Sequence, residues 1–253
     1  MWSLVSSVFK SYDYILGYEI MAEPRTKIVN QSVVQQFYQG GCDIVHQQDP
    51  DTPCIVGPAP FYKAWMLNET LIINGDMNKN KVIYTVDFYV PVNYITSGVQ
   101  GDQYNDLTYP SVYPCNVALP GWTCAGRGHS PPCFCPDSPT EPVGVNKTWL
   151  VSLLTQYPLA FRDKYNLPLL VNQWGMYKQV SAERGGLKYF QDIVDIFNQY
   201  KIHSICWVWK WSYPNNAWNG YEIVHNFTSN NTLIVDYNRL DIINSSWNIS
   251  VHT

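Results

Sequence analysis

The sequence predicts an α/β fold built on one parallel β-sheet, and three observations support this class. Apolar, β-branched and aromatic runs recur along the 253 residues, and each is stopped by Pro or Gly. Segments with apolar residues three and four positions apart, the spacing of an amphipathic helix, lie between these runs. The runs are nearly continuous rather than alternating, which is typical of parallel strands buried on both faces.

Five strands are expected, in the order Tyr14–Pro24, Cys54–Pro60, Lys81–Pro91, Leu167–Gly175 and His203–Pro214. The helical patterns between them cover Val33–His46, Leu150–Tyr165 and Leu187–Tyr200, with weaker helices before the first strand and around Tyr237–Ile243. We therefore expect five βα units in a single domain over residues 1–253. A Cys-, Pro- and Gly-rich loop insertion at residues 96–147 interrupts them.

Composition excludes several classes of protein. The net charge is −4 and no Lys/Arg cluster occurs, so a nucleic-acid partner has no electrostatic support. No run approaches the roughly 18 apolar residues of a membrane span. Charged residues make up only 14% of the chain while 10 Trp and 19 Tyr are present. Sugar-binding proteins share this composition, because sugar rings stack on aromatic faces.

Seven Cys indicate an oxidising compartment. Four of them, Cys115, Cys124, Cys133 and Cys135, lie in the insertion. Their spacing lacks the paired ends of a zinc ribbon, so disulfides are favoured over a zinc site, in any of three pairings. Cys42 and Cys54 are either a further pair or separate buried thiols, and Cys206 is expected to be a buried free thiol.

Glycosylation motifs point to the same compartment. Sequons of the form N-x-S/T start at seven positions, which are Asn30, Asn68, Asn146, Asn226, Asn230, Asn244 and Asn248. Together with the Cys they predict a secreted, extracellular glycoprotein. Residues 2–12 lack the basic segment and cleavage site of a signal peptide, so we expect the front of the protein to be missing.

Polar and aromatic residues stand where the predicted strands end. The first strand ends in Glu23 before Pro24, the third carries Asp87 and Tyr89, and the fourth ends in residues 172–175, Asn-Gln-Trp-Gly. In the fifth, Trp207, Trp209 and Trp211 fall on one face by the period-two spacing of a strand. Because parallel strands present their carboxyl ends at one edge, these side chains are expected to form one aromatic-lined polar site.

The segments GYEIMAEPR, IYTVDFYVP and LPLLVNQWG and the Trp-rich last strand, in this order and spacing, resemble the second half of a glycoside hydrolase family 5 enzyme. The resemblance covers residues 2 to about 245, apart from the insertion. It implies a cellulase-like (β/α)₈ TIM barrel of which this chain holds about strands four to eight. It also implies hydrolysis of a β-linked polysaccharide by a retaining mechanism with two carboxyl groups, and no cofactor.

Carried over residue by residue, the resemblance makes Glu23 the general acid/base. Tyr89 matches the Tyr that hydrogen-bonds near the nucleophile, and Trp207, with Trp209 as second choice, matches the Trp that stacks on the sugar. A carboxyl that donates a proton near neutral pH must be kept protonated by burial and a like charge.

Three positions depart from the family pattern. Ala22 replaces the usual Asn that contacts the sugar, and Asp87 replaces the usual His. Gln173 occupies the nucleophile position, and an amide cannot attack the anomeric carbon as a carboxylate does. Either Gln173 is a variant of an active enzyme, or the protein is a natural sugar-binding relative without the chemistry, or Asp87 activates water in an inverting reaction. The last is the least favoured.

Five strands cannot close an eight-stranded barrel. We therefore expect either an incomplete gene product or association with a complementary chain. Three functions remain open, which are a β-glucan hydrolase, a polysaccharide-binding module without turnover, and an interaction protein on a decayed barrel. Glycan linkage stays open among β-1,4-glucan, mannan and β-1,3-glucan. The five His show no metal-ligand spacing, so no metal is expected.

Overall fold

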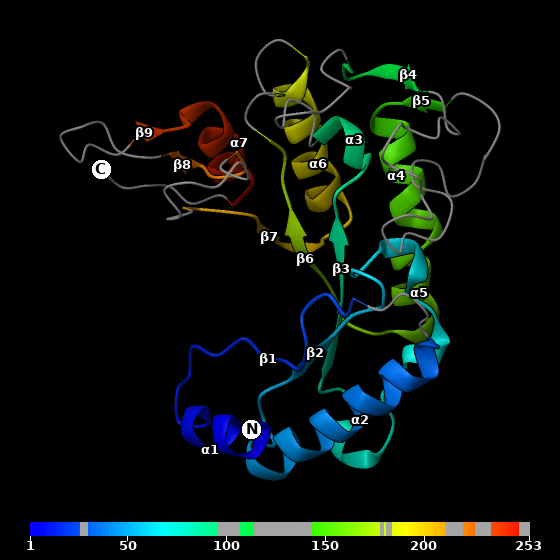
Figure 1. Cartoon of the computed structure of the whole chain (residues 1–253), viewed down its shortest axis with the longest axis vertical. Coiled ribbons are helices and arrows are strands. Elements are labelled where there is room, and N and C mark those ends of the chain that lie inside the picture. Colours follow the sequence, from blue (N-terminus) through cyan, green and yellow to red (C-terminus); the bar gives the residue numbers. More distant parts are fainter. Residues whose placement is uncertain are drawn as a thin grey trace. The chain divides into compact units, whose positions relative to one another are not determined.

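A computed structural model describes residues 1–25, 30–95, 107–113, 143–177, 180, 184–210, 220–225 and 234–247. All five predicted strands are present, although several are shorter than expected. They are β1 (Tyr18–Glu19), β2 (Cys54–Val56), β3 (Val82–Phe88), β6 (Leu169–Trp174) and β7 (His203–Cys206). They are hydrogen-bonded in chain order, β1-β2-β3-β6-β7 (Figure 1). The pairs β1–β2 and β2–β3 are parallel, with Cys54 opposite both Tyr18 and Val82, which confirms a parallel α/β sheet.

The chain divides into two compact units, and each is described by itself. The first contains residues 1–87 and 153–172 of the described chain. Its helices are α1 (Trp2–Phe9), α2 (Gln31–Gln48), the end of α4 (Lys147–Gln156) and α5 (Pro158–Tyr165), with 3₁₀ turns η1 (Ala64–Met66), η2 (Glu69–Leu71) and η3 (Asp76–Asn78). The second contains α3 (Val92–Ile95), β4 (Ser111–Tyr113), β5 (Val143–Val145), α6 (Gly186–Gln199), β7, β8 (Val224–His225), β9 (Ile234–Val235) and α7 (Tyr237–Trp247). A single domain over residues 1–253 stays a prediction.

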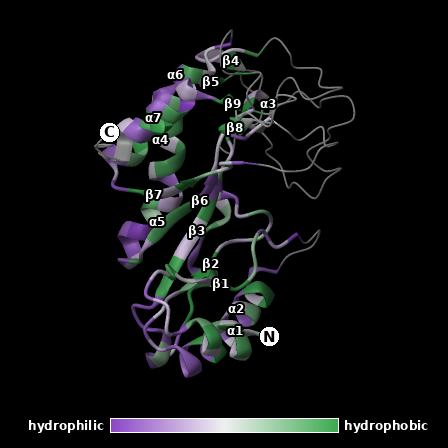
Figure 2. Ribbon diagram, turned by 90° about the vertical axis from the view of Figure 1, so that its left-hand side faces the viewer, coloured by the Kyte–Doolittle hydropathy of each residue, from purple (hydrophilic) through white to green (hydrophobic). Residues whose placement is uncertain are grey.

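The core of the first unit lies between α2 and the strands. Tyr38, Cys42 and Val45 lie on one face of α2 at helical spacing and are fully buried, as are Cys54 and Val56 of β2. Hydrophobic residues run along much of β2 and β3 (Figure 2). These β-branched runs form strands because they pack well on a pleated, buried surface.

The second unit is built around aromatic contacts of α6. Phe88 and Trp174, at the ends of β3 and β6, both contact Phe197 at centroid distances of 6.1 and 5.5 Å. Trp174 also packs against Phe190, with the ring planes tilted and the centroids 4.7 Å apart. The predicted helix Leu187–Tyr200 is therefore confirmed to within one residue at each end.

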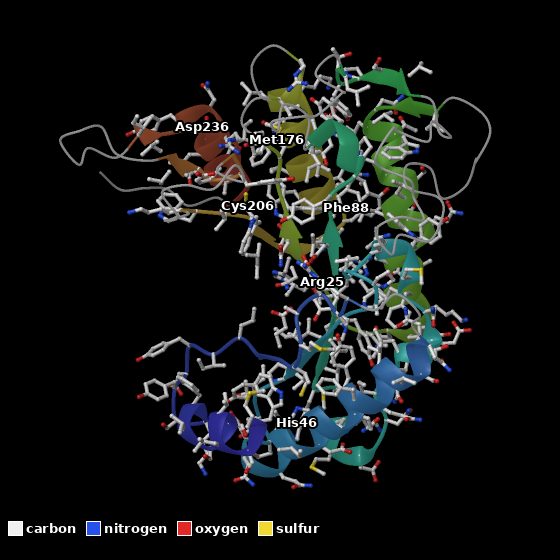
Figure 3. All side chains as sticks on the ribbon, in the orientation of Figure 1. Arg25, His46, Phe88, Met176, Cys206 and Asp236 are labelled. Carbon is white, nitrogen blue, oxygen red and sulfur yellow. The ribbon has the colours of Figure 1, made fainter. Side chains whose placement is uncertain are left out.

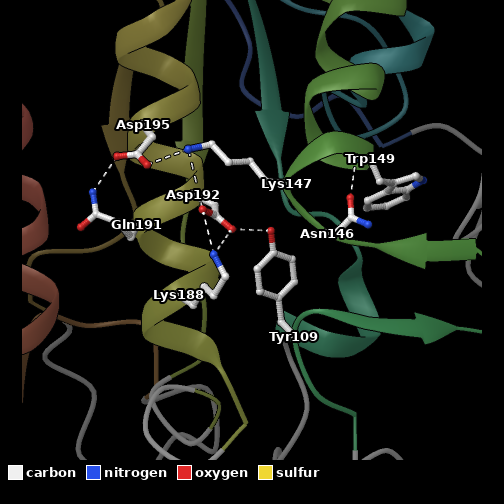
Figure 4. A network of polar contacts seen from close by, with 8 residues as sticks. All are labelled: Tyr109, Asn146, Lys147, Trp149, Lys188, Gln191, Asp192 and Asp195. Atoms are coloured by element: carbon white, nitrogen blue, oxygen red, sulfur yellow. Dashed lines mark hydrogen bonds and ion pairs between the residues drawn. The ribbon is translucent and has the colours of Figure 1, made fainter.

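Polar contacts join α6 to the start of α4 (Figure 4). Lys147 Nζ lies 2.7 Å from Asp195 and 3.8 Å from Asp192. Asp192 is nearly buried and accepts a 2.9 Å hydrogen bond from the Tyr109 hydroxyl, while Lys188 pairs with it at 3.1 Å. A buried carboxylate is tolerated here because two ammonium groups and a hydroxyl satisfy it.

Three expectations need correction. Residues 150–165 form two helices, because α4 ends at Gln156 and α5 restarts at Pro158, whose fixed φ suits a first helical position. β7 ends at Cys206, so Trp207 and Trp209 do not continue a strand with alternating faces, and Trp211 lies outside the described residues. The described parts of residues 96–147 contain an antiparallel pair, β4–β5, where only a loop is expected.

The three cysteines that the structure describes form no disulfide. Cys42 and Cys54 are both buried free thiols, so the alternative of separate thiols is confirmed, and Cys206 is a free thiol that is only partly buried. A hydrogen bond from the Cys42 thiol lowers the pKa of Cys54 to about 7, and His46 adds to this effect. The four clustered Cys lie outside the described residues. In the described part of the chain no helix is long and apolar enough to cross a membrane.

Candidate active site

The sequence-predicted site residues fall in both units. Ala22, Glu23 and Asp87 belong to the first unit, while Tyr89, Gln173, Trp207 and Trp209 belong to the second. The structure brings Tyr89 and Gln173 into direct contact. The two sets are therefore built up separately.

Glu23 follows β1 in a segment held by two tyrosines. The hydroxyls of Tyr38, from α2, and Tyr62, after β2, both donate to the carbonyl of Met21, at 3.1 and 2.5 Å. Gly57 permits this approach, because a Cβ there would lie 2.5 Å from the Tyr62 ring. The backbone before Glu23 is thus fixed by side chains that the sequence reasoning did not single out.

The Glu23 side chain is half-buried. Its φ of 41° lies in the left-handed region, which a non-Gly residue adopts only where its surroundings enforce it. Arg25 is its ion-pair partner at 4.0 Å, and the Arg25 guanidinium also lies over the Phe61 ring, 5.5 Å from its centre. Ala22 is exposed. Because its side chain is a methyl group, this position lacks the amide that the family pattern uses.

A second carboxyl, Glu19, lies on β1 and was missed by the sequence reasoning. Asn172 Nδ2 donates to Glu19 Oε1 at 2.8 Å. Burial raises the pKa of Glu19, and the nearby charge of Glu23 adds to this, while hydrogen bonds with Tyr62 and Asn172 oppose it. Its signal in the sequence is a carboxyl group inside an otherwise apolar strand, which predicts a buried polar contact.

Asp87 stands near the end of β3 and is 7% exposed. Its backbone N–H donates to the Tyr62 carbonyl at 2.8 Å, and a parallel bridge joins it to Lys63. Burial lowers the pKa of Lys63 to about 8. Asp87 thus places a buried carboxyl group near the end of this strand.

The contact that identifies the second set is between Tyr89 and Gln173. The Tyr89 hydroxyl donates to Gln173 Oε1 at 3.2 Å, across 84 residues of sequence. Gln173 is half-buried on β6, and the ring of Tyr221 packs edge-on against Tyr89 at 5.8 Å. Tyr221 is a further site residue that sequence reasoning missed, because it follows the Trp-rich segment without any recognisable motif.

Trp207 and Trp209 differ in exposure. The Trp207 N–H donates to the Trp174 carbonyl at 2.8 Å, which ties the segment after β7 to the end of β6, and the residue is half-buried. Trp209 is 58% exposed. Of the two, Trp207 is bonded through its backbone to Trp174, the residue that follows Gln173. Trp209 presents a free aromatic surface to solvent. In the described residues no group of three or more His, Cys, Asp or Glu could hold a metal.

Comparisons with known proteins identify one family and several solved structures of similar fold. The sequence pattern of the family described as Cellulase (glycosyl hydrolase family 5) matches residues 1–213. A comparison with characterised protein sequences gave no match. Among solved structures, similar folds include subunit Z of the Clostridioides difficile cellulose synthase, with 16% identity, a TM-score of 0.65 and coverage of 96% of this chain and 65% of that one.

Two further structures have similar scores. The endoglucanase Cel5A of Thermotoga maritima is 15% identical with a TM-score of 0.67, covering 95% of this chain and 63% of that one. A family 5 xyloglucanase of Paenibacillus pabuli is 13% identical with a TM-score of 0.63, covering 97% and 65%. This chain therefore spans less than two thirds of the length of each of these structures.

Proposed function

Because the chain belongs to glycosyl hydrolase family 5, we propose that its site binds a β-linked polysaccharide of the cellulose type and that position 173 controls whether the polysaccharide is cut. The observation that carries this proposal is the hydrogen bond from Tyr89 to Gln173 at the end of β6. A Tyr that orients a group at this position is what the resemblance of the sequence to the family requires.

In the proposed reaction Glu23 donates a proton to the glycosidic oxygen and a carboxylate at position 173 attacks the anomeric carbon. Water then hydrolyses the covalent intermediate, with Glu23 as the base. Gln173 lacks the negative charge that this attack needs, so hydrolysis is expected to be very weak. Trp207, or Trp209, stacks on a sugar ring, and no cofactor is needed.

A second candidate is polysaccharide binding without hydrolysis. The Tyr89–Gln173 hydrogen bond favours it, because the amide oxygen satisfies the same donor that would otherwise orient a carboxylate. Binding would then persist although the chemistry is lost. Inversion with Asp87 as the base remains the least favoured alternative.

Exposed apolar residues in the first unit also favour a protein partner. Leu4, Tyr14 and Leu16 are 69%, 88% and 61% exposed, and β1 ends the hydrogen-bonded order of the described strands. We propose that a complementary polypeptide with further βα units covers this apolar surface and that full activity depends on it. Secretion, glycosylation and disulfides in residues 115–135 remain predictions of the sequence.

The test compares hydrolysis of soluble β-glucans and binding of cello-oligosaccharides by the wild type and Gln173→Glu, after circular dichroism shows that both fold. Gln47→Glu, which adds the same charge at an exposed position of α2, is the matched control. Hydrolysis in Gln173→Glu alone supports the first candidate. Binding in all three proteins without hydrolysis supports the second, and folded proteins that neither bind nor cut overturn both.

A further inference from the structure

A buried arginine in α7 lies beyond residues 1–213, the part of the chain that matches the family. Arg239 is fully buried, and its guanidinium donates to three backbone carbonyls. These are Met176 at 3.0 Å, Tyr221 at 3.2 Å and Glu222 at 2.5 Å. Its Nε also donates to Asp236 at 2.7 Å, so the buried charge is both paired and hydrogen-bonded.

The carbonyls that Arg239 fixes belong to segments of the second unit that are far apart in sequence. Met176 follows β6, whereas Tyr221 and Glu222 precede β8. Figure 3 labels Met176, Cys206 and Asp236, and all three side chains lie in the same region of this unit. One planar, five-donor group therefore sets how the end of β6 and residues 221–222 lie relative to each other.

Ile223 and Val224, at the start of β8, in turn bind the backbone of Val208 and Trp209. Ile223 N–H donates to the Val208 carbonyl at 3.0 Å, and Val224 N–H donates to the Trp209 carbonyl at 2.8 Å. The Asp236 N–H donates to the Ile223 carbonyl at 2.8 Å, so the ion-pair partner of Arg239 binds the same segment. The backbone after β7 is thus anchored to residues 223 and 224.

The Tyr221 side chain carries the effect to the candidate site. Its ring meets those of Tyr89 and Tyr177 edge-on, both at 5.8 Å. It also lies against Gly175, since a Cβ there would be 3.4 Å from Tyr221 Cδ1. Edge-to-face packing restricts the rotation of Tyr89, which is the residue that donates to Gln173.

We propose that Arg239 is a positioning residue for the sugar site: through the backbone of Tyr221 it seats the Tyr221 ring, and this ring holds the Tyr89 hydroxyl on the side chain at position 173. The inference rests on the proposed function for its catalytic consequence. Lys cannot replace Arg239, because an ammonium group has no planar fork with which to bind several carbonyls and Asp236 at once.

The first test is NMR spectroscopy with ¹³Cζ-labelled tyrosine, which does not depend on hydrolysis. The Tyr89 signal is assigned from its loss in Tyr89→Phe. We expect it to move toward the position of exposed tyrosines in Arg239→Lys and in Tyr221→Leu. It should stay unchanged in Tyr221→Phe, which keeps the ring, and in Arg162→Lys, which alters an exposed ion pair in α5.

The second test uses the Gln173→Glu background. A hydrogen bond from Tyr89 favours the carboxylate form at position 173. Loss of this hydrogen bond should therefore shift the acidic limb of the pH–rate profile to higher pH, by about one pH unit. The value of kcat should fall about tenfold in Tyr221→Leu while KM changes little, and Tyr221→Phe should keep the kcat and the pH profile of the Gln173→Glu background.

The outcomes separate the two proposals. If Gln173→Glu hydrolyses no glucan, the proposed function loses support, but the Tyr89 signal still tests the positioning role. An unchanged Tyr89 signal in folded Arg239→Lys and Tyr221→Leu overturns the inference. If Arg239→Lys does not fold, Tyr221→Leu decides, because it removes the ring that the proposal requires and keeps the backbone carbonyl that Arg239 binds.

Discussion

At the scale of single residues, Gly175 shows how closely the site is packed. A Cβ on this residue would lie 2.4 Å from the Trp207 carbonyl oxygen, a backbone atom that cannot turn aside as a side chain can. We predict that Gly175→Ala destabilises the protein by about 1–3 kcal/mol, which is typical of overpacking. Because the displaced segment carries Trp207, cello-oligosaccharide binding should weaken at least tenfold, measured by calorimetry.

The control for this substitution is Gly144→Ala in β5. A Cβ at Gly144 would meet only the Asn146 side chain, at 3.7 Å, which is an ordinary contact. Its melting temperature and sugar affinity should equal those of the wild type. Equal affinity in Gly175→Ala and the wild type would show that Trp207 does not contribute to sugar binding.

A second prediction at this scale concerns Glu19, whose pKa burial raises. A raised pKa means that the folded protein holds this proton more tightly than the unfolded chain does. The stabilisation is therefore complete below the pKa of the unfolded chain and is lost as pH rises through the raised pKa of the folded state. Glu19→Gln keeps an acceptor for Asn172 and removes the charge.

We therefore expect the melting temperature of Glu19→Gln, relative to the wild type, to increase from pH 4 to pH 7. Glu69→Gln, at an exposed position of η2, should show little of this trend. A pH-independent difference for Glu19→Gln would mean that its carboxyl has the same pKa in the folded and unfolded states.

How far the sequence predicts the site depends on the range of its contacts. Tyr89 could be placed near position 173 from the resemblance to the family, and the 3.2 Å hydrogen bond confirms that contact. Glu19 and Asn172 could not be paired, since 153 residues separate them and neither forms a local pattern. Contacts of this kind depend on strand register, which a single sequence does not specify.

At the scale of helices and strands, apolar periodicity predicts most of the architecture. The patterns over Val33–His46 and Leu187–Tyr200 correspond to α2 and α6, because each helix buries one continuous face. The prediction fails at residues 207–210, where tryptophans at alternate positions of the sequence suggest a longer strand than β7. There the backbone pairs with residues 223 and 224 instead, a choice made by tertiary contacts.

Helix ends also bear on the glycosylation motifs. Three sequon asparagines cap helices: Asn30 accepts from Ser32 N–H, Asn68 from Thr70 N–H and Asn146 from Trp149 N–H, each at 3.0 Å. Asn is favoured at this position because its side-chain oxygen satisfies an unpaired N–H of the first turn. Capping therefore accounts for these three residues whether or not they carry a glycan.

This account yields a prediction for Asn146, which caps α4 (Figure 4). In protein made without glycosylation, Asn146→Ala should lower the free energy of unfolding by about 1 kcal/mol, whereas Asn146→Asp, which keeps the acceptor oxygen, should preserve it. Urea denaturation measures both. Asn244→Ala removes a sequon inside α7 and should cost little, so an equal loss there would contradict the capping role.

At the scale of the whole molecule, apolar surface in the first unit is concentrated before β1. Leu4 and Val8 lie one helical turn apart on α1 and are 69% and 52% exposed, and Leu16, just before β1, is 61% exposed. Exposed apolar patches of this kind mark interaction surfaces in soluble proteins. This chain covers 63–65% of the length of the three similar structures.

The last prediction follows from this surface. When no partner is present, the isolated chain should self-associate as its concentration rises, because association removes the apolar side chains from water. The triple variant Leu4→Ser, Val8→Ser, Leu16→Ser should remain monomeric, as measured by sedimentation velocity from about 1 to 100 μM. The control replaces Val112 and Ile234 by Ser; these are exposed apolar residues of the second unit, on β4 and β9. A wild type that stays monomeric throughout, or a triple variant that associates equally, would show that another surface accounts for the exposed apolar area, and the complementary chain would lose its main support.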